Sequence, residues 1–236
     1  SGKNQVRDML KGRLQTAEKT LANGLSRGAY SDGTGNSGLE IHGTQALIAN
    51  AAGSTVGGIN SSDYKNWDNQ RYKVGAVPTS SNIYDVMLEL YLATSRGNDA
   101  PDCIIADNTY FKIYSSSLHQ NARYMDRKTA EAGFRNNLLF QGAPVIFDGG
   151  LNMSEADYDP GDTSNTHVRT KPGTLAPVGM YFINCKYLKF CVHRDRNNVV
   201  LSGPDRPLNQ DSTTKIMAGM GNIIVTNRAM HGRLYT

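Results

Sequence analysis

The sequence lacks any long run of apolar residues. No stretch approaches the roughly 20 residues that a membrane-spanning helix needs, so the sequence predicts no membrane partner. Hydrophobic residues still make up 39% of the 236 residues, and charged residues make up 19%. This composition excludes an intrinsically disordered chain and is typical of a folded protein with a sizeable core.

Cysteine is also scarce. The three cysteines, Cys103, Cys185 and Cys191, are odd in number and widely spaced, which argues against a disulfide framework and favours reduced thiols. A zinc site would need short paired spacings with histidine nearby. Cys185 and Cys191 have His193 close by, but no second pair exists, so we expect no metal site.

Catalytic patterns are missing as well. "HRD" at 193–195 occurs in kinase catalytic loops, but the other parts of the kinase set are not in place. Asp157, Asp159 and Asp162 lack the glycine and glutamate of a calcium loop, which leaves an adventitious surface cation as the alternative. The five histidines lie far apart, and none accompanies a nucleophile motif. We therefore expect no catalytic residue, no cofactor and no enzymatic activity.

One pattern does match a cofactor signature. "GTGNSG" at 33–38 spells G-x-G-x-x-G, the fingerprint of dinucleotide sites. Such a site needs a strand, then the glycines, then a helix whose N-terminus points at the pyrophosphate. Here a helical pattern precedes the glycines, and no clear amphipathic helix follows them. The pattern therefore indicates a turn, with a nucleotide-binding enzyme as a remote alternative.

Positive charge is concentrated at the start of the chain. The net charge is +4, and residues 1–28 hold two acids and six bases, so the whole excess lies there. The six bases are Lys3, Arg7, Lys11, Arg13, Lys19 and Arg27. They form either a solvated helix face or a surface that attracts a polyanion without reading sequence.

The same segment predicts a long helix. Apolar residues recur at steps of three or four from Lys3 to Arg27, and Gly28 follows as a stop signal. The six apolar positions are Val6, Leu10, Leu14, Ala17, Leu21 and Leu25. The length, roughly 37 Å at 1.5 Å per residue, suits a strut.

Two further helices and a strand are predicted in the middle of the chain. Ser81 or Asn82 would cap a helix that closes at Gly97. Its buried stripe is expected to be Ile83, Val86, Met87, Leu90 and Ala93. "DCIIAD" predicts a buried strand, after which Asp107 or Asn108 caps a helix to about Gln120. That helix is expected to bury Phe111, Tyr114 and Leu118.

Strands dominate the rest. "LLFQGAPVIF" predicts a hairpin around Gly142, and "VGMYFINCKYLKFCVHRD" predicts two strands. Residues 152–176 are expected to form a surface loop, and the last segment two long strands about a turn. The fold class is therefore α+β, with mostly antiparallel late strands.

Residues 50–80 are rich in small and polar residues and predict loops with short strands. They contain the only tryptophan, Trp67, followed by Arg71 and Tyr72. Trp67 is either a packing anchor for a long loop or, with Arg71 and Tyr72, a subunit contact, since tryptophan and arginine are favoured at interfaces.

Taken in order, these segments resemble tailed-bacteriophage major capsid proteins of the Hong Kong 97-like fold. "LSRGAYSDGTGNSGLEIHG" is similar to the end of their spine helix and its glycine turn. The matching residues are Asp32, Gly33, Thr34, Gly35, Gly38 and Leu39. "STVGGINSSDYKNWDNQ", "APDCIIADNTYFKIYSSSL", "FQGAPVIFDGGL", "MYFINCKYLKF" and "HRDRNNVVLSGPDRPLNQD" resemble consecutive later segments. The likeness spans nearly the whole chain, but the family's N-terminal arm and extended loop have no counterpart, which indicates a truncated chain.

The resemblance implies a domain plan and a function. Residues 1–45 would be the spine helix and turn of the peripheral domain, 46–205 an α/β axial domain, and 206–236 long antiparallel strands returning to the peripheral domain. The protein would be a capsid subunit found in the virion and made in the host cytoplasm. Its partners would be its own copies in hexamers and pentamers, packaged double-stranded DNA, and portal, scaffolding and decoration proteins. An encapsulin-like compartment is the alternative with the same fold.

Overall fold

The chain divides into two compact units in a computed structural model. One unit contains residues 1–43 and 189–224, and the other contains residues 44–188 and 225–236. The structure describes residues 2–121, 138–148, 179–197, 199–200 and 216–236. Residues 189–224 thus lie with the first unit, and the last twelve residues lie with the second.

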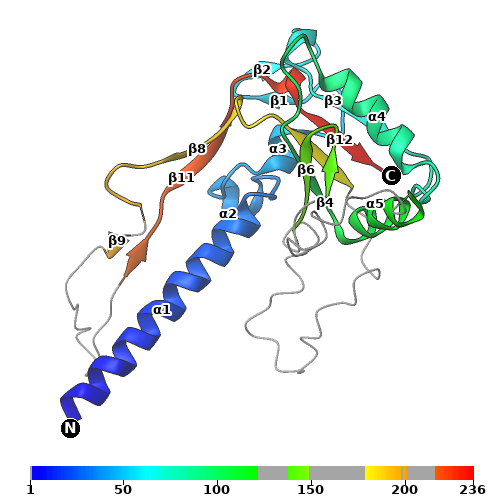
Figure 1. Ribbon diagram of the computed structural model, residues 1–236. Coiled ribbons are helices and arrows are strands. Elements are labelled where there is room, and N and C mark those ends of the chain that lie inside the picture. Colours follow the sequence, from blue (N-terminus) through cyan, green and yellow to red (C-terminus); the bar gives the residue numbers. More distant parts are fainter. Residues whose placement is uncertain (1, 122–137, 149–178, 198, 201–215) are drawn as a thin grey trace. The chain divides into compact units, whose positions relative to one another are not determined.

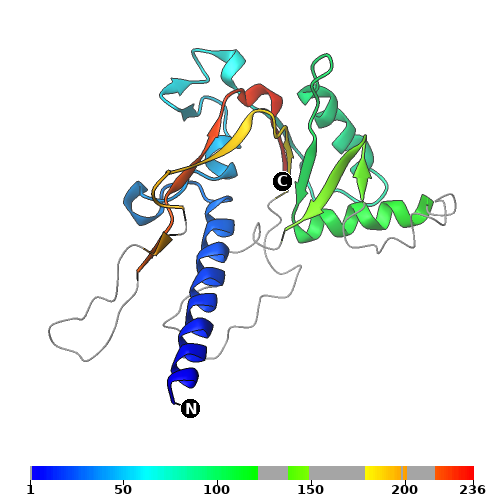
Figure 2. The ribbon, with the colours of Figure 1, turned by 60° about the vertical axis from the view of Figure 1, so that its left-hand side comes forward.

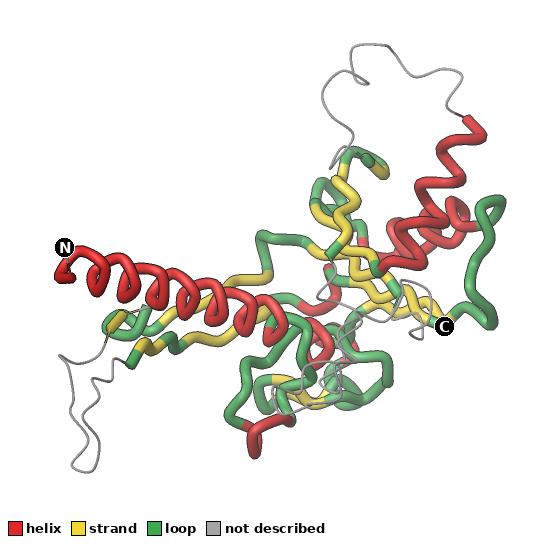
Figure 3. The backbone as a smooth tube through the Cα atoms, turned by 90° about the horizontal axis from the view of Figure 1, so that it is seen from below, coloured by secondary structure: helices red, strands yellow, loops and turns green. Residues whose placement is uncertain are grey.

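The first unit is built on the predicted long helix. Helix α1 runs from Gly2 to Gly28 without interruption (Figure 3). The one-turn helix α2, Gly35–Gly38, follows it. Strand β8, Leu188–Val192, pairs with β11, Gly221–Val225, as a two-stranded ribbon. Strands β9 (Val199–Val200) and β10 (Met217–Ala218) form a short antiparallel pair.

The second unit contains a six-stranded sheet in the order β3-β12-β7-β4-β6-β5. Its strands are β3 Gln70–Lys73, β4 Cys103–Ala106, β5 Leu139–Phe140, β6 Ala143–Phe147, β7 Met180–Ile183 and β12 Gly232–Tyr235. β12 pairs parallel with β3, and β4 pairs parallel with β6. The other three pairings are antiparallel, so the sheet is more mixed than the sequence predicted.

Helices α4, Ile83–Thr94, and α5, Asn108–Asn121, cover one face of this sheet (Figure 1). Alternate strand residues face them, as the period of two in a strand requires. The fully buried side chains of this layer include Met87, Leu90, Ile104, Tyr110, Phe140 and Phe182. The sequence predicted helices α4 and α5 and strand β4, and these predictions are confirmed.

The predicted cap of α5 is confirmed, whereas α4 differs in detail from the prediction. Asp107 caps α5, since its carboxylate accepts a hydrogen bond from the backbone N–H of Tyr110 (2.7 Å). Asn82 precedes α4, but its side chain accepts from Thr79 instead of from the helix. Thr94, not Ala93, completes the buried stripe of α4.

The predicted hairpin around Gly142 is confirmed. Leu139 pairs with Pro144 and Phe140 with Ala143. Gln141 and Gly142 both have positive φ, at 50° and 86°, which is the conformation of the two-residue turns that match strand twist.

The chain end does not form two long paired strands. β11 ends at Val225, the short helix η5 (Arg228–Met230) follows, and β12 then enters the six-stranded sheet. β12 joins this sheet, and its residue Leu234 is part of the buried core there. Residues 124–137 and the predicted loop at 152–176 lie outside the described residues.

The remaining elements are short and lie between residues 44 and 67 of the sequence. They are α3 Thr44–Leu47, β1 Thr55–Val56, β2 Ile59–Asn60 and η1 Lys65–Trp67. β1 and β2 form an antiparallel hairpin. None of the helices in the described part of the chain is long and apolar enough to cross a membrane.

Candidate functional site

Helix α1 is exposed along most of its described length. From Lys11 to Ser26 only Leu14, Leu21 and Leu25 are half-buried, and Ala17, predicted in the same stripe, is exposed. The Thr16 and Thr20 hydroxyls donate to main-chain oxygens one turn earlier (3.0 and 2.9 Å). The helix is therefore a strut whose surface stays accessible to a large partner.

The basic residues surround this helix instead of gathering on one side. Steps of four place positions 3, 7 and 11 along one side. Arg13 projects roughly 160° away from Lys11, because successive residues turn by about 100°. Lys11, Arg13 and Lys19 are exposed, and Arg27 is half-buried. This distribution produces a positive field around the helix and does not form a specific binding site for one ligand.

The glycine turn at residues 33–38 changes the direction of the chain after α1. Gly33 and Gly38 have φ of 75° and 81°, and a Cβ at Gly33 would lie 2.6 Å from the His42 ring, so only glycine suits position 33. The Asp32 carboxylate accepts from the Thr34 N–H and hydroxyl (3.0 and 2.8 Å), and these bonds lower the pKa of Asp32. Gly33 follows α1, and Gly35 and Gly38 are the first and last residues of the one-turn helix α2.

Trp67 lies at the end of η1 and is half-buried. Its indole N–H donates to the Val56 carbonyl (3.2 Å), which fixes the ring on the β1–β2 hairpin. With Gly58, Ile59, Tyr64 and Asn66, Trp67 lines an open hollow. Tyr64 is 65% exposed there. The indole is thus held within its own chain, and its surroundings present an aromatic surface to solvent.

Arg71 and Tyr72 both have partners within the chain. The Arg71 guanidinium donates two bonds to the Asp68 carboxylate (2.7 and 2.6 Å) and one to the Ala51 carbonyl (3.2 Å). The guanidinium lowers the pKa of Asp68. A hydrogen bond with Glu89 raises the pKa of Tyr72, whose ring packs against the core. These contacts support the packing interpretation of Arg71 and Tyr72.

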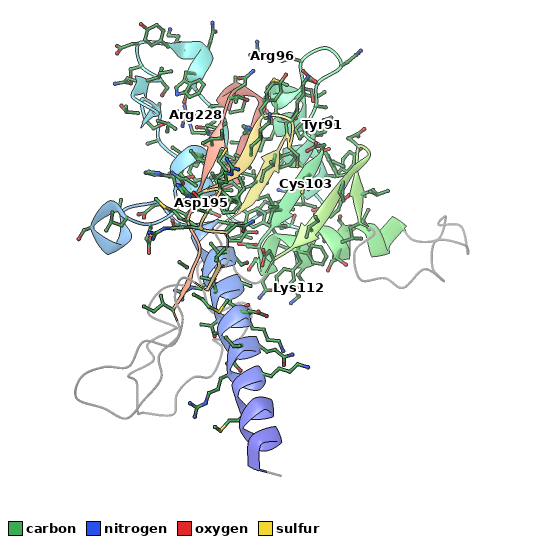
Figure 4. The ribbon with its side chains drawn as sticks, turned by 90° about the vertical axis from the view of Figure 1, so that its left-hand side faces the viewer. Tyr91, Arg96, Cys103, Lys112, Asp195 and Arg228 are labelled. Atoms are coloured by element: carbon green, nitrogen blue, oxygen red, sulfur yellow. The ribbon has the colours of Figure 1, made fainter. Side chains whose placement is uncertain are left out.

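Arg228 connects the segments around Trp67 by hydrogen bonds, and no sequence pattern predicted this role. Its side chain is fully buried, although no carboxylate lies within ion-pair distance in the described chain. Nε donates to the Leu47 carbonyl (2.8 Å), and Nη2 donates to Ser54 Oγ and Asn69 Oδ1 (2.8 and 3.0 Å). Burial lowers the pKa of Arg228. Figure 4 shows the residue inside the packed part of the molecule.

The Arg228 contacts connect residues 159 to 181 positions apart. An arginine followed by Ala-Met-His carries no local pattern that distinguishes a buried arginine from an exposed one. The signal therefore lies only in the tertiary contacts.

Among the described residues, neither a reactive thiol nor a metal site is indicated. Burial raises the pKa of Cys185 to about 11 and also raises that of Cys103, which disfavours the reactive thiolate. No group of three or more potential ligands that could hold a metal ion occurs among the described residues. Residues 157–162 lie outside them. In the "HRD" segment, the Asp195 N–H donates to His193 Nδ1 (3.2 Å) in an exposed turn.

Comparison with known proteins points to one class of fold. No model of a known protein family matches the chain, and no curated protein sequence matches it. Among solved structures the likeness is to a phage capsid chain, so the chain has a phage capsid-like fold. That structure is the cyanophage A-1(L) capsid asymmetric unit, with a TM-score of 0.59 and 11% sequence identity. The match covers 95% of this chain and 67% of the cyanophage chain.

Proposed function

We propose that this chain is the major capsid protein of a tailed double-stranded DNA bacteriophage, with the Hong Kong 97-like fold. It would assemble into hexamers and pentamers of an icosahedral shell that encloses the genome. The observation that carries the proposal is the likeness to the cyanophage capsid chain over 95% of this chain. The exposed strut α1 supports it, because such a helix has little to pack against within its own chain.

In this proposal the two units are the two domains of a capsid subunit. The first unit, with α1 and the β8–β11 ribbon, is the peripheral domain, and α1 is its spine helix. The second unit, with the six-stranded sheet, α4 and α5, is the axial domain. In this proposal the peripheral domain comprises residues 1–43 and 189–224, and the axial domain comprises residues 44–188 and 225–236.

The basic residues of α1 are proposed to contact packaged DNA. Exposed Lys11, Arg13 and Lys19 would attract phosphates without reading sequence, and the contact would weaken with salt. Lys3, Arg7 and Arg27 would add to the same field. Weak attraction suits a genome that must leave the shell.

Lateral contacts are proposed for the surface around Trp67, Arg71 and Tyr72. The hollow beside Tyr64 is the part of this surface that a neighbouring copy could fill. Portal, scaffolding and decoration proteins would be further partners. The mature protein would be located in the virion after synthesis in the host cytoplasm.

Electron microscopy of the purified protein tests the function. We expect closed shells, and an absorbance ratio at 260 and 280 nm that indicates enclosed nucleic acid. Shells that enclose proteins in place of DNA would support an encapsulin-like compartment instead. Soluble monomers that bind a dinucleotide would overturn the proposal in favour of a nucleotide-dependent enzyme.

A further inference from the structure

Strand β8 has one side along which no strand of the described residues is paired. β11 pairs with it on one side, and no described strand lies along the other (Figures 1 and 2). Residues 189–192 are all exposed, with Phe190 at 50% and Val192 at 39%. A two-stranded ribbon is marginally stable by itself in water, so this edge is a place where association would add stability.

The hydrogen bonds of the ribbon identify which main-chain groups are free. The His193 N–H donates to the Met220 carbonyl (2.8 Å), and the Thr226 N–H donates to the Tyr187 carbonyl (2.9 Å). Main-chain groups alternate sides along an antiparallel strand. The odd-numbered residues of β8 therefore point toward β11, and Leu188, Phe190 and Val192 point outward.

This edge carries little of the protection that exposed edges usually have. Natural edge strands avoid unwanted pairing with prolines, bulges or several charges. β8 has the sequence LKFCV, which contains no proline and one charged residue, Lys189. Its outward groups are therefore open to another extended strand.

The strand is complementary to a second copy of itself. An antiparallel pairing centred on Phe190 places Phe190 opposite Phe190, and Leu188 opposite Val192. All outward N–H and C=O groups of both strands then meet in hydrogen-bonded pairs. Lys189 lies opposite Cys191, so no like charges face each other, and the central aromatic pair is favourable.

We propose that β8 pairs antiparallel with β8 of a second copy of this chain. The product is a four-stranded sheet about a two-fold axis, with a continuous apolar face. Each copy contributes to this face Leu188, Phe190, Val192, Ile223 and Val225. The contact would operate within the proposed shell, so it rests on the proposed function.

The opposite edge of the ribbon explains why the association closes at two copies. The Asn222 side chain accepts from the N–H groups of His42 and Ile223 (2.9 Å each). The outward N–H of Ile223 on the β11 edge is thereby already bonded within the chain. An isologous contact through β8 alone forms a closed pair and not an open filament.

A disulfide test follows from the register. Lys189→Cys would place a thiol opposite the neighbouring copy's Cys191 in a non-hydrogen-bonded pair, about 4.5 Å between Cα atoms, which a disulfide spans. The background carries Cys103→Ser and Cys185→Ser. Oxidised glutathione accepts the two electrons: two thiols become one disulfide, and two glutathione thiols are released.

We expect covalent dimers on a non-reducing gel. The matched control adds Cys191→Ser and should remain monomeric; monomers in both variants would overturn the proposal.

A second measurement does not depend on cysteine. Phe190→Lys places two positive charges face to face at the two-fold axis. We expect the dissociation constant for self-association, measured by sedimentation velocity, to rise roughly tenfold or more. Met220→Lys is the control, since Met220 is similarly exposed (58%) and lies immediately before β11. Equal effects of the two substitutions would contradict the proposal.

The two proposals fail in distinguishable ways. Shells that form normally with Phe190→Lys and give no disulfide would refute the β8 contact and leave the capsid function standing. Disulfide-linked dimers that never form shells would refute the capsid function and support the contact.

Discussion

Arg228 shows how one residue can hold a region that is otherwise loop. Three acceptors far apart in the sequence converge on its guanidinium. A buried guanidinium without a carboxylate is stable only while its donors are satisfied. The segment between η1 and β3, which contains Asn69, is therefore positioned from the other end of the chain.

Replacement of Arg228 is expected to destabilise the second unit. Arg228→Met removes the donors to Leu47, Ser54 and Asn69 and leaves buried acceptors unpaired, a loss of roughly 2–4 kcal/mol. Urea unfolding followed by Trp67 fluorescence measures this loss. Arg96→Met, on an exposed arginine, is the control and should stay within about 0.5 kcal/mol. Equal stability of the two variants would show that Arg228 does not have this role.

His231 is expected to make the stability of the chain depend on pH. The side chain is fully buried, and burial lowers its pKa from 6.5 to about 4. Its Nδ1 accepts from the Asn184 N–H (3.2 Å). Because the unfolded chain binds the proton more readily, the stabilisation is complete above pH 6.5 and is lost as the pH falls toward 4.

The variant His231→Asn isolates this effect, because an amide oxygen can still accept from Asn184. Between pH 7 and pH 5 the unmodified chain should lose about 2 kcal/mol more unfolding free energy than the variant. Urea titrations at several pH values measure the difference. Parallel pH profiles of the two proteins would rule out a titrating role for His231.

At the scale of elements, α1 and α4 are stabilised differently. α4 buries Ile83, Met87 and Leu90 in the core, so tertiary packing supports it. α1 is mostly exposed over its described length, and its stability depends more on intrinsic helix propensity. Its internal glycines are therefore weak points.

Substitution of a helix glycine should strengthen α1. A Cβ at Gly24 would meet nothing within 4 Å, so Gly24→Ala is expected to stabilise the helix by about 0.5–1 kcal/mol. Hydrogen exchange of the α1 amides measures this. Gly33→Ala should have the opposite sign, because its φ is 75° and a Cβ would collide with His42. A destabilising effect of Gly24→Ala would mean that the helix is limited by something other than propensity.

At the scale of the whole molecule, the basic helix is predicted to govern DNA retention. Reversing Lys3, Arg7 and Lys11 to Glu removes three positive charges and adds three negative ones. The DNA content of purified shells, followed by absorbance against salt, should fall and its salt dependence should flatten. Reversal of the exposed Lys65, Lys73 and Lys112 is the control and should have a smaller effect. Unchanged DNA content in the α1 variant would refute the genome-facing role of this helix.

The sequence by itself determined the local elements. Apolar periodicity located α1, α4 and α5, since a helix face repeats every 3.6 residues whatever it packs against. Asp107 and the Gln141–Gly142 turn could be read locally for the same reason, because caps and turns depend on a few adjacent residues.

The tertiary structure alone decided how distant segments combine. β8 and β12 each combine apolar residues with one basic residue, yet only β12 enters the six-stranded sheet. Pairing depends on which edges are available and not on composition. Likewise, only the folded chain brings Leu47, Ser54 and Asn69 around Arg228. Long-range contacts leave no periodic trace in the sequence, whereas the local ones do.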